Sequence, residues 1–355
     1  MAPVRPDGCS FDAQAPAVTV VIPNYNGRHL LETCLPALRA DLREKANAEV
    51  IVVDNGSSDD SVAWLRSDWP KVTVIGLDEN RGFSFACNIG ARASRSSIVV
   101  FHNNDAIVQP GWSAALRLAL ESSPDVVIAG GLTLFLDRPT HVNSAGIRIA
   151  ISGAAVDNGF GRPLAEVDLS ERDVAGVSGV SMAVRREWFA AVGGFDEDFF
   201  MYFEDADLCL RAWVEGHRVR FTPDAVVRHA FGGTAGDRYV SLRNYYGSRN
   251  RLLTAAKSFG TGSLAAAVAL SIVQDAAVVL WLLATGRFAR SRAAAGGKLR
   301  GTLHGVRALP RYLREPRSAV RRRRSSRELR ALGVVDPLGV SLREFAHMRR
   351  VGRRG

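Results

Sequence analysis

The chain has 355 residues, of which 47% are hydrophobic and 23% charged, so it can bury a large core and hold one sizeable catalytic domain plus an appendage. Its net charge of +10 is carried by the C-terminal part, because residues 286–355 contain 20 Lys and Arg against 4 Asp and Glu, whereas the first 285 residues contain 26 against 32. The folded part is therefore acidic, which argues against a basic groove for nucleic acid, and we predict no nucleic-acid partner.

Residues 1–17 are polar and contain proline, without the charged and then apolar segments of a secretory signal, so we expect a disordered N-terminus and a cytoplasmic catalytic part. The four cysteines are scattered at no metal or redox spacing, which indicates a reducing compartment without a disulfide framework.

Short apolar, β-branched runs at 18–22, 50–53, 72–75 and 98–101 predict buried parallel strands. Helical patterns at 29–45 and 82–94 lie between them and complete βαβ units. We therefore expect a parallel α/β sheet that binds ligands at the carboxyl ends of its strands.

The second half of the chain predicts mixed strands and loops over 126–180, helices over 188–192 and 205–216, a strand over 219–221, and a polar, arginine-containing helix over 239–257. Within it, residues 194–211 place several carboxylates among aromatic side chains. These carboxylates either favour a helix start near Asp205 or provide a partly dehydrated general base, and both roles are compatible.

Residues 264–284 form an apolar stretch with Asp275 near its middle. A spanning helix would bury that carboxylate at a cost of about 2.5 to 3.5 kcal/mol, so we favour a helix in the membrane interface or a broken pair. A helix packed on the catalytic domain or on a second subunit is the alternative. The arginines that follow, including residues 321–324, would be attracted to an anionic membrane by about 1 kcal/mol each, and the last thirty residues or so alternatively form a solvated tail.

Four ordered motifs, at residues 19–27, 51–59, 80–90 and 101–105, resemble the nucleotide-sugar half of family 2 glycosyltransferases of the GT-A fold. The segments 176–186, 194–205 and 245–251, together with His229, look like the acceptor half of the rhamnosyltransferase-like branch. The resemblance covers about residues 18–255. It implies an α/β GT-A nucleotide-sugar-binding fold, with a Rossmann-like mixed sheet flanked by helices and a helical, basic C-terminal appendage.

The domain boundaries that follow are a GT-A domain over 18–257, a helical membrane-associated region over 258–320 and a basic tail over 321–355. The GT-A domain divides into a donor-binding half, 18–110, and an acceptor half, 111–257.

The resemblance also implies roles for individual residues. Asp205 corresponds to the catalytic base, and Glu204 would orient the acceptor or Asp205. The family's Asp-x-Asp metal motif is here Asn103-Asn104-Asp105, so Asp105 and His229 would bind Mg²⁺ or Mn²⁺ with Asn103 as a weaker neutral ligand. The implied substrate-binding residues are Pro23, Asn24, Tyr25, Asp54, Asn55, Arg81, Gly82, Asn88, Asn104, Gly179 and Arg249.

The implied activity is inverting transfer of a sugar from a nucleotide diphosphate to a hydroxyl of a lipid-linked or cell-envelope glycan. Rhamnose from dTDP-rhamnose is the favoured donor sugar, and UDP-sugars come next. The enzyme would work at the cytoplasmic face of the cell membrane, peripherally or interfacially anchored to an anionic surface, and a homo-oligomer is compatible with the sequence. A non-catalytic nucleotide- or sugar-binding protein, or a nucleic-acid-binding protein acting through the basic tail, are the alternatives.

Overall fold

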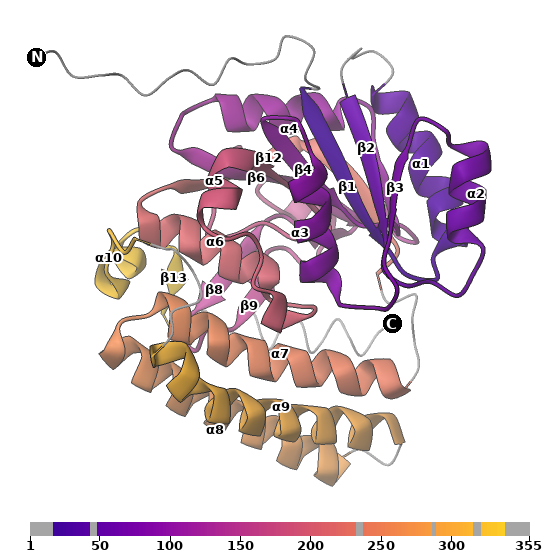
Figure 1. The fold of residues 1–355 in the computed structure, drawn as a ribbon. Coiled ribbons are helices and arrows are strands. Elements are labelled where there is room, and N and C mark those ends of the chain that lie inside the picture. The colour runs from indigo at the N-terminus through magenta and orange to yellow at the C-terminus, as the bar shows by residue number, and fades with distance from the viewer. Residues whose placement is uncertain (1–16, 43–47, 232–236, 286–288, 315–320, 338–355) are drawn as a thin grey trace, which may run out of the picture.

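The computed structural model describes residues 17–42, 48–231, 237–285, 289–314 and 321–337. The expected disordered N-terminus lies outside these residues, apart from residue 17, and so does the predicted basic tail beyond residue 337. A large mixed sheet has helices on both faces, and three long helices pack together below it (Figure 1).

The four apolar runs of the N-terminal half form parallel strands, as predicted. The central strand β1 (Val18–Asn24) pairs with β2 (Ala48–Asp54) and β4 (Ile98–His102), and β2 pairs with β3 (Thr73–Gly76). Helices α1 (Arg28–Leu42), α2 (Ser61–Asp68) and α3 (Phe83–Ala93) connect these strands. The register places Asn24 beside Asp54 at the carboxyl ends, where the sequence predicts ligand binding.

The second half of the sheet is mixed, in the order β10-β12-β6-β11-β4-β1-β2-β3. Strand β11 (Ser181–Arg185) runs antiparallel to both β4 and β6 (Val126–Phe135), whereas β12 (Arg218–His229) runs parallel to β6. The remaining strands of this sheet are β5 (Ala106–Val108), β7 (Val142–Ser144) and β10 (Arg172–Asp173).

A second, three-stranded sheet consists of β8 (Ile147–Ala150), β9 (Ala155–Asp157) and β13 (Val335–Asp336). Strand β13 comes from the C-terminal end of the described chain and pairs in parallel with β8.

Alternating side chains of the large sheet pack against two helical layers. Val20 and Ile22 of β1 contribute to a core with α1, α2 and α4 (Trp112–Glu121), whereas Val21 contributes to the core with α3, α5 (Arg186–Ala191) and α6 (Glu204–Glu215). Two short 3₁₀ turns complete this part of the fold, η1 (Leu164–Glu166) and η2 (Glu197–Phe199).

The helices α7 (Asp237–Ser258), α8 (Thr261–Thr285) and α9 (Ala289–Arg314) lie side by side (Figure 1). Asp275 of α8, only 3% exposed, lies 2.7 Å from Arg251 and 3.0 Å from Lys298 and accepts a hydrogen bond from Thr302. The carboxylate inside the apolar stretch is therefore paired within the protein, as in the alternative of a helix packed on the catalytic domain. By length and composition, Thr261–Ala284 is the one helix of the described chain that is apolar enough to cross a membrane, and 17% of its apolar window is buried.

Residues 321–337, which include the helix α10 (Ser326–Ala331), pack against α6 and α7. Arg324 donates to the carbonyl oxygens of Gly216 and His217 at 2.8 and 3.0 Å, and Arg322 donates to that of Ser258 at 2.9 Å. Two of the four consecutive arginines thus bind carbonyl groups at helix ends, where orphan acceptors need donors.

Candidate active site

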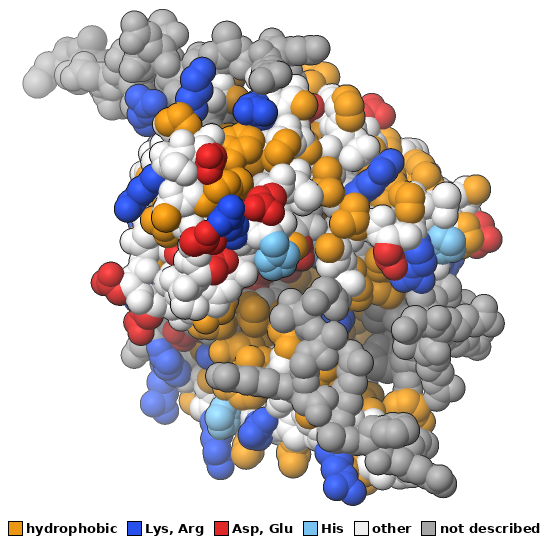
Figure 2. Space-filling model, turned by 90° about the vertical axis from the view of Figure 1, so that its right-hand side faces the viewer, with side chains coloured by type: hydrophobic (Ala, Val, Ile, Leu, Met, Phe, Trp, Pro, Cys, Tyr) orange, Lys and Arg blue, Asp and Glu red, His pale blue; other side chains and the backbone are white. Residues whose placement is uncertain are grey.

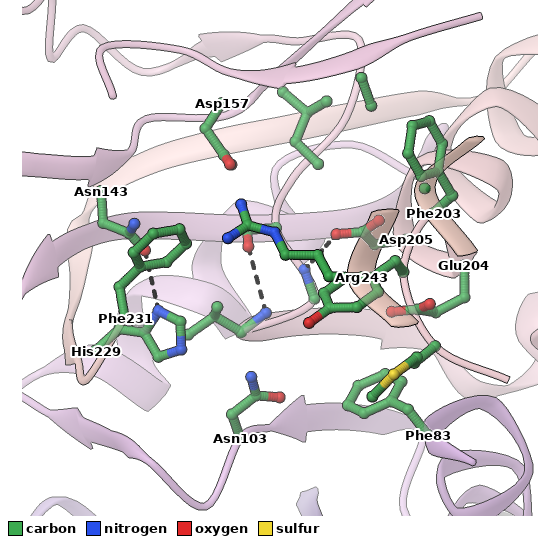
Figure 3. Close-up of a pocket in the computed structure, with 18 of the residues that line it drawn as sticks. Phe83, Asn103, Asn143, Asp157, Phe203, Glu204, Asp205, His229, Phe231 and Arg243 are labelled. Atoms are coloured by element: carbon green, nitrogen blue, oxygen red, sulfur yellow. Dashed lines mark hydrogen bonds between the residues drawn. The ribbon is translucent and has the colours of Figure 1, made fainter. Parts of the chain in front are cut away.

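A cavity of about 420 Å³ lies between the two sheets and α7. Six residues that the sequence predicts for the site line it: Asn103, Asp105, Gly179, Glu204, Asp205 and His229. They come from the ends of β4 and β12, the loop before β11 and the start of α6. Figure 3 shows the side chains of Asn103, Glu204, Asp205 and His229 around a common space.

The loop before α6 has an unusual backbone. Phe200, Tyr202 and Phe203 have φ values of 62°, 66° and 73°, a region that residues other than glycine rarely adopt. The side-chain amide of Asn250 in α7 holds this loop by donating to the carbonyl oxygens of Phe199, Met201 and Tyr202 at 2.9, 3.0 and 2.9 Å. Helix α7 therefore determines how the carboxylates at the start of α6 enter the cavity.

The Asp205 carboxylate is oriented by backbone donors. One oxygen accepts from the N–H of Gly179 at 2.9 Å and the other from the N–H of Ala206 at 2.7 Å. Burial raises the pKa of Asp205 and outweighs these hydrogen bonds, which lower it. A buried, fixed carboxylate with a raised pKa is suited to accept a proton from a substrate hydroxyl.

Glu204 is 7% exposed, and its Oε2 has no hydrogen-bond partner among the described residues. Burial and the adjacent charge of Asp205 hold the pKa of Glu204 well above its usual range. Two neighbouring buried carboxyl groups do not readily ionise together, so Glu204 holds a proton while Asp205 is charged.

Asp105 and His229 meet at the opposite side of the cavity. His229 Nε2 lies 3.3 Å from Asp105 Oδ1, which is buried and has no hydrogen bond within the described chain. Nδ1 of His229 lies 3.0 Å from the side-chain oxygen of Asn143, which fixes the ring and leaves Nε2 facing Asp105. The described residues contain no group of three or more His, Cys, Asp or Glu side chains at metal-binding spacing.

A second group of predicted residues lies at neighbouring strand ends. The Asn24 amide donates to Asp54 at 3.0 Å and accepts from Asn104 at 2.8 Å, and Ser57 donates to Asp54 at 2.7 Å. Pro23 is in β1 beside them, and the ring of Tyr25 is 50% exposed. This hydrogen-bonded group joins β1, β2 and the loop after β4, and its role in binding a nucleotide stays a prediction.

Asn55, Arg81 and Gly82 shape the loop before α3. The Asn55 side chain accepts from the backbone N–H of Arg81 at 2.9 Å and donates to the carbonyl of Gly82 at 3.1 Å. The Arg81 guanidinium lies 3.6 Å from the ring centroid of Phe85. Gly82 has φ 88°, and a side chain there would collide with Phe200, so this position requires glycine.

Two predicted substrate-binding residues, Asn88 and Arg249, turn away from the cavity and support the loop before α6. A third residue, Asp207, supports α6 itself. The Asn88 amide both donates to and accepts from the backbone of Phe195, at 2.8 and 2.9 Å. Arg249 donates to the carbonyl of Asp198 at 2.7 Å. Asp207 of α6 is fully buried and pairs with Arg211 in the same helix and with Lys257 of α7, which connects the two helices.

Several cavity residues were missed by the sequence analysis, among them Asn143, Asp157, Phe231 and Arg243. Burial raises the pKa of Asp157 to about 6. The sequence around Asp157 contained a signal that could have found it. Residues 156–159 read Val-Asp-Asn-Gly, and the same four residues occur at positions 53–56, across the end of β2. The other three belong to no motif.

Comparison with known proteins agrees with this geometry. Residues 19–193 match the family model for glycosyl transferase family 2. The chain is 29% identical over 231 residues to the N-acetylglucosaminyl-diphospho-decaprenol L-rhamnosyltransferase of Mycobacterium tuberculosis, which covers 59% of this chain and 75% of that protein. It is 27% identical over 241 residues to the dTDP-rhamnosyl transferase RfbF of Shigella flexneri, which covers 63% and 76%. Other relatives are much longer, since the chain spans only 25% of y4gI of Sinorhizobium fredii and 17% of RfbC of Myxococcus xanthus.

Among solved structures, GalNAc-T7 with UDP, GalNAc and Mn²⁺ matches with a TM-score of 0.53 at 17% identity, over 68% of this chain and 51% of that one. At this identity the match concerns the fold, and it confirms the predicted GT-A architecture. Residues 19–193 therefore belong to glycosyl transferase family 2. Within that family the chain is rhamnosyltransferase-like, as the motifs predicted.

Proposed function

We propose that this protein is an inverting glycosyltransferase that moves rhamnose from dTDP-rhamnose, or otherwise a sugar from a UDP-sugar, to a hydroxyl of a lipid-linked or cell-envelope glycan. The observation that carries the proposal is the Asp205 carboxylate, which lines the cavity with both oxygens held by backbone N–H groups. Rhamnose is preferred because the relatives from Mycobacterium tuberculosis and Shigella flexneri are named for rhamnosyl transfer, and the former name also contains a lipid diphosphate.

In the proposed reaction, Asp205 accepts the proton of the acceptor hydroxyl while that oxygen attacks the anomeric carbon. The bond from this carbon to the diphosphate oxygen breaks in the same displacement, so the configuration inverts. The raised pKa of Asp205 makes it a stronger base than an exposed aspartate. Because Glu204 holds a proton, it places no second negative charge beside Asp205.

We further propose that Asp105, His229 and Asn103 hold Mg²⁺ or Mn²⁺. Two ligand atoms at a right angle, each about 2.1 Å from one ion, are about 3 Å apart, which fits the 3.3 Å between Asp105 Oδ1 and His229 Nε2. The unpaired Asp105 oxygen supports the same assignment. Such an ion, when bound, would neutralise charge on the leaving diphosphate. Because Asn103 brings a neutral amide, we expect weaker metal binding than two carboxylates would give.

The outer surface of helices α8 and α9 supports a location at the cytoplasmic face of the cell membrane. Every exposed residue of α8 from 264 to 284 is Ala, Ile, Val or Leu, including Val273 and Leu280 at 65% and 68% exposure. The neighbouring α9 exposes leucines and arginines and has no Asp or Glu. Figure 2 shows apolar and basic side chains, without acidic ones, along the lower edge where these helices lie. An apolar face beside cations matches the interface of an anionic membrane.

Transfer and donor hydrolysis measured across dTDP- and UDP-sugars test the activity. We expect Asp205→Asn to lower turnover by about 10²- to 10⁴-fold, since the amide keeps the shape but does not accept the proton, while thermal stabilisation by the nucleotide is retained. Asp224→Asn, at an exposed position on β12, is the matched control. Wild-type turnover by Asp205→Asn removes the proposed base, and a wild-type protein that neither turns over nor is stabilised by any nucleotide tested refutes the function.

Sedimentation of the full chain with vesicles tests the membrane proposal. We expect binding to vesicles with anionic lipid, partial release by high salt because exposed charges are screened within about 8 Å at physiological ionic strength, and weaker binding of Leu280→Glu. The control is Leu118→Glu on α4, where the leucine is 59% exposed. Full-length protein that stays in solution with anionic vesicles at low salt contradicts the proposal.

A further inference from the structure

The cavity has a second wall that none of the sequence motifs accounts for. Asp157 at the end of β9, Phe231 just after β12 and Arg243 in α7 line it. In Figure 3, Asp157 and Asn103 lie at opposite sides of the cavity, with the Arg243 guanidinium and the Asp205 carboxylate between them. Asp157 and Arg243 therefore lie beyond the proposed base as seen from Asn103, whereas Phe231 packs against the ring of His229 with 6.2 Å between the centroids.

Arg243 forms no close ion pair within the described chain, although its positive charge acts on the carboxylate of Asp157. No hydrogen bond or ion pair to its guanidinium occurs among the described residues, and its contact is with the ring of Phe231, 5.3 Å from the centroid. By contrast, the two other arginines in the central part of α7 are engaged, Arg249 with the Asp198 carbonyl and Arg251 with Asp275. A guanidinium that projects freely into a cavity is suited to bind phosphate, which it recognises with two parallel hydrogen bonds.

Phe231 and Asp157 add the two features with which proteins recognise a sugar. The Phe231 ring is 40% exposed, and the rings of Phe135 and Phe160 hold it from behind at centroid distances of 5.8 and 5.2 Å. It thus presents a fixed apolar surface to the cavity. Asp157 forms no ion pair within the described chain; the Ser144 hydroxyl bonds to its carboxylate, whose two oxygens can accept further hydrogen bonds from the hydroxyl groups of a sugar.

We propose that Asp157, Phe231 and Arg243 form the acceptor subsite, in which the acceptor's sugar ring packs on Phe231, its hydroxyls bind Asp157 and its phosphate binds Arg243. The assignment rests on the proposed glycosyl transfer, because it takes Asp205 as the point where the acceptor hydroxyl loses its proton. The donor diphosphate is the other source of phosphate. We assign the acceptor because Arg243 and Asp157 lie across the cavity from Asn103 and belong to elements, α7 and β9, that do not contribute to the Asn24, Asp54 and Asn104 group.

Calorimetric binding of a short-chain alkyl diphosphate, with the nucleotide and Mn²⁺ at saturation, tests the phosphate part without any turnover. We expect wild-type protein to bind this probe and Arg243→Gln to bind it at least about tenfold more weakly, the usual size of a lost hydrogen bond to a charged group. Arg300→Gln is the control, since Arg300 is exposed on α9 and donates to Ser241. Equal affinities of wild type and Arg243→Gln overturn the assignment. If the wild-type protein binds the probe without nucleotide but not with saturating nucleotide, the two compete, and Arg243 belongs to the donor site.

A panel of pyranosyl diphosphates tests the sugar part. At least one sugar should bind more tightly than the bare alkyl diphosphate, and Asp157→Asn and Phe231→Leu should each remove this gain while keeping the affinity for the bare probe. A wild-type protein that gains nothing from any pyranose refutes the sugar contacts. Asp205→Asn should bind every probe like the wild type, so a failure of the proposed catalysis remains distinguishable from a failure of the subsite.

Discussion

The loop before α6 offers a sharp test of the structure, because one side chain from another helix holds it. Asn250 is fully buried, and its amide nitrogen donates to three carbonyl oxygens of residues 199–202. We expect Asn250→Ala to loosen this loop and displace Glu204 and Asp205, which follow it directly.

The size of the effect follows from the contacts. An amide has two hydrogens, so its removal leaves about two buried carbonyl groups without a donor, at about 1 to 3 kcal/mol each. The strained residues Phe200, Tyr202 and Phe203 then lose their restraint, and each can gain about 1 to 3 kcal/mol by returning to an ordinary backbone conformation. If one of these three residues relaxes, about 2 kcal/mol is recovered from the roughly 4 kcal/mol lost at the two carbonyl groups, so we expect a net destabilisation of about 2 kcal/mol. A shift of about 1 Å at a reacting group costs about 100-fold in rate.

Denaturant unfolding and steady-state transfer kinetics measure both effects. The control is Asn244→Ala in the same helix, because the Asn244 amide donates to the carbonyl of Val240 at 2.8 Å within α7 itself. Asn250→Ala should therefore lose transfer activity much more than Asn244→Ala while still binding nucleotide. The reasoning fails if Asn250→Ala turns over at the wild-type rate, or if its loss of activity only follows the fraction of unfolded protein.

Three further expectations concern charged groups. Because burial and the neighbouring carboxylate raise the pKa of Glu204, its ionisation destabilises the fold, so Glu204→Gln should raise the melting temperature at pH 8 and make no difference at pH 4, where both forms are neutral. Asp105→Ala and His229→Ala should weaken nucleotide binding in Mn²⁺ but not in EDTA, with the larger effect at Asp105, and wild-type activity that is insensitive to EDTA would contradict the metal site. Asp275→Ala leaves buried cations such as Arg251 unpaired, so unfolding experiments should show a loss of about 3 to 5 kcal/mol, and a loss below 1 kcal/mol would refute this pairing.

The sheet could be predicted from the sequence because its strands are local patterns, but their lengths could not. The sequence predicted only mixed strands and loops over 126–180, whereas strand β6 runs without interruption from Val126 to Phe135 through Gly130 and Gly131. Val177 and Ala225 occupy the space where side chains of these two glycines would lie, so the residues that look like a break allow close packing. Strand β12 likewise continues beyond Phe221 through an irregularity in its pairing with β6.

Some residues of the candidate site could likewise be predicted from the sequence, whereas others could not. The motifs pointed to the six cavity residues because five of them lie at the end of a strand or the start of a helix, and Gly179 lies in the loop before β11. The orientation of Asn88 could not be read, since its partner Phe195 lies 107 residues away and turns the amide inward. Arg243 was missed because nothing in the local sequence distinguishes it from Arg249, which is bound to a backbone carbonyl.

The pairing of β13 with β8 affects the order in which the protein folds during its synthesis. Ile149 and Val335 are partners in this sheet although 186 residues separate them, and Ile147 of β8 lines the cavity. Chains are made from the N-terminus, and domains fold as they emerge from the ribosome. The parallel strands around β1 can form early, whereas the sheet behind Ile147 stays incomplete until residue 336 has left the ribosome. A growing chain would therefore form the hydrogen-bonded group of Asn24, Asp54 and Asn104 before the cavity is complete.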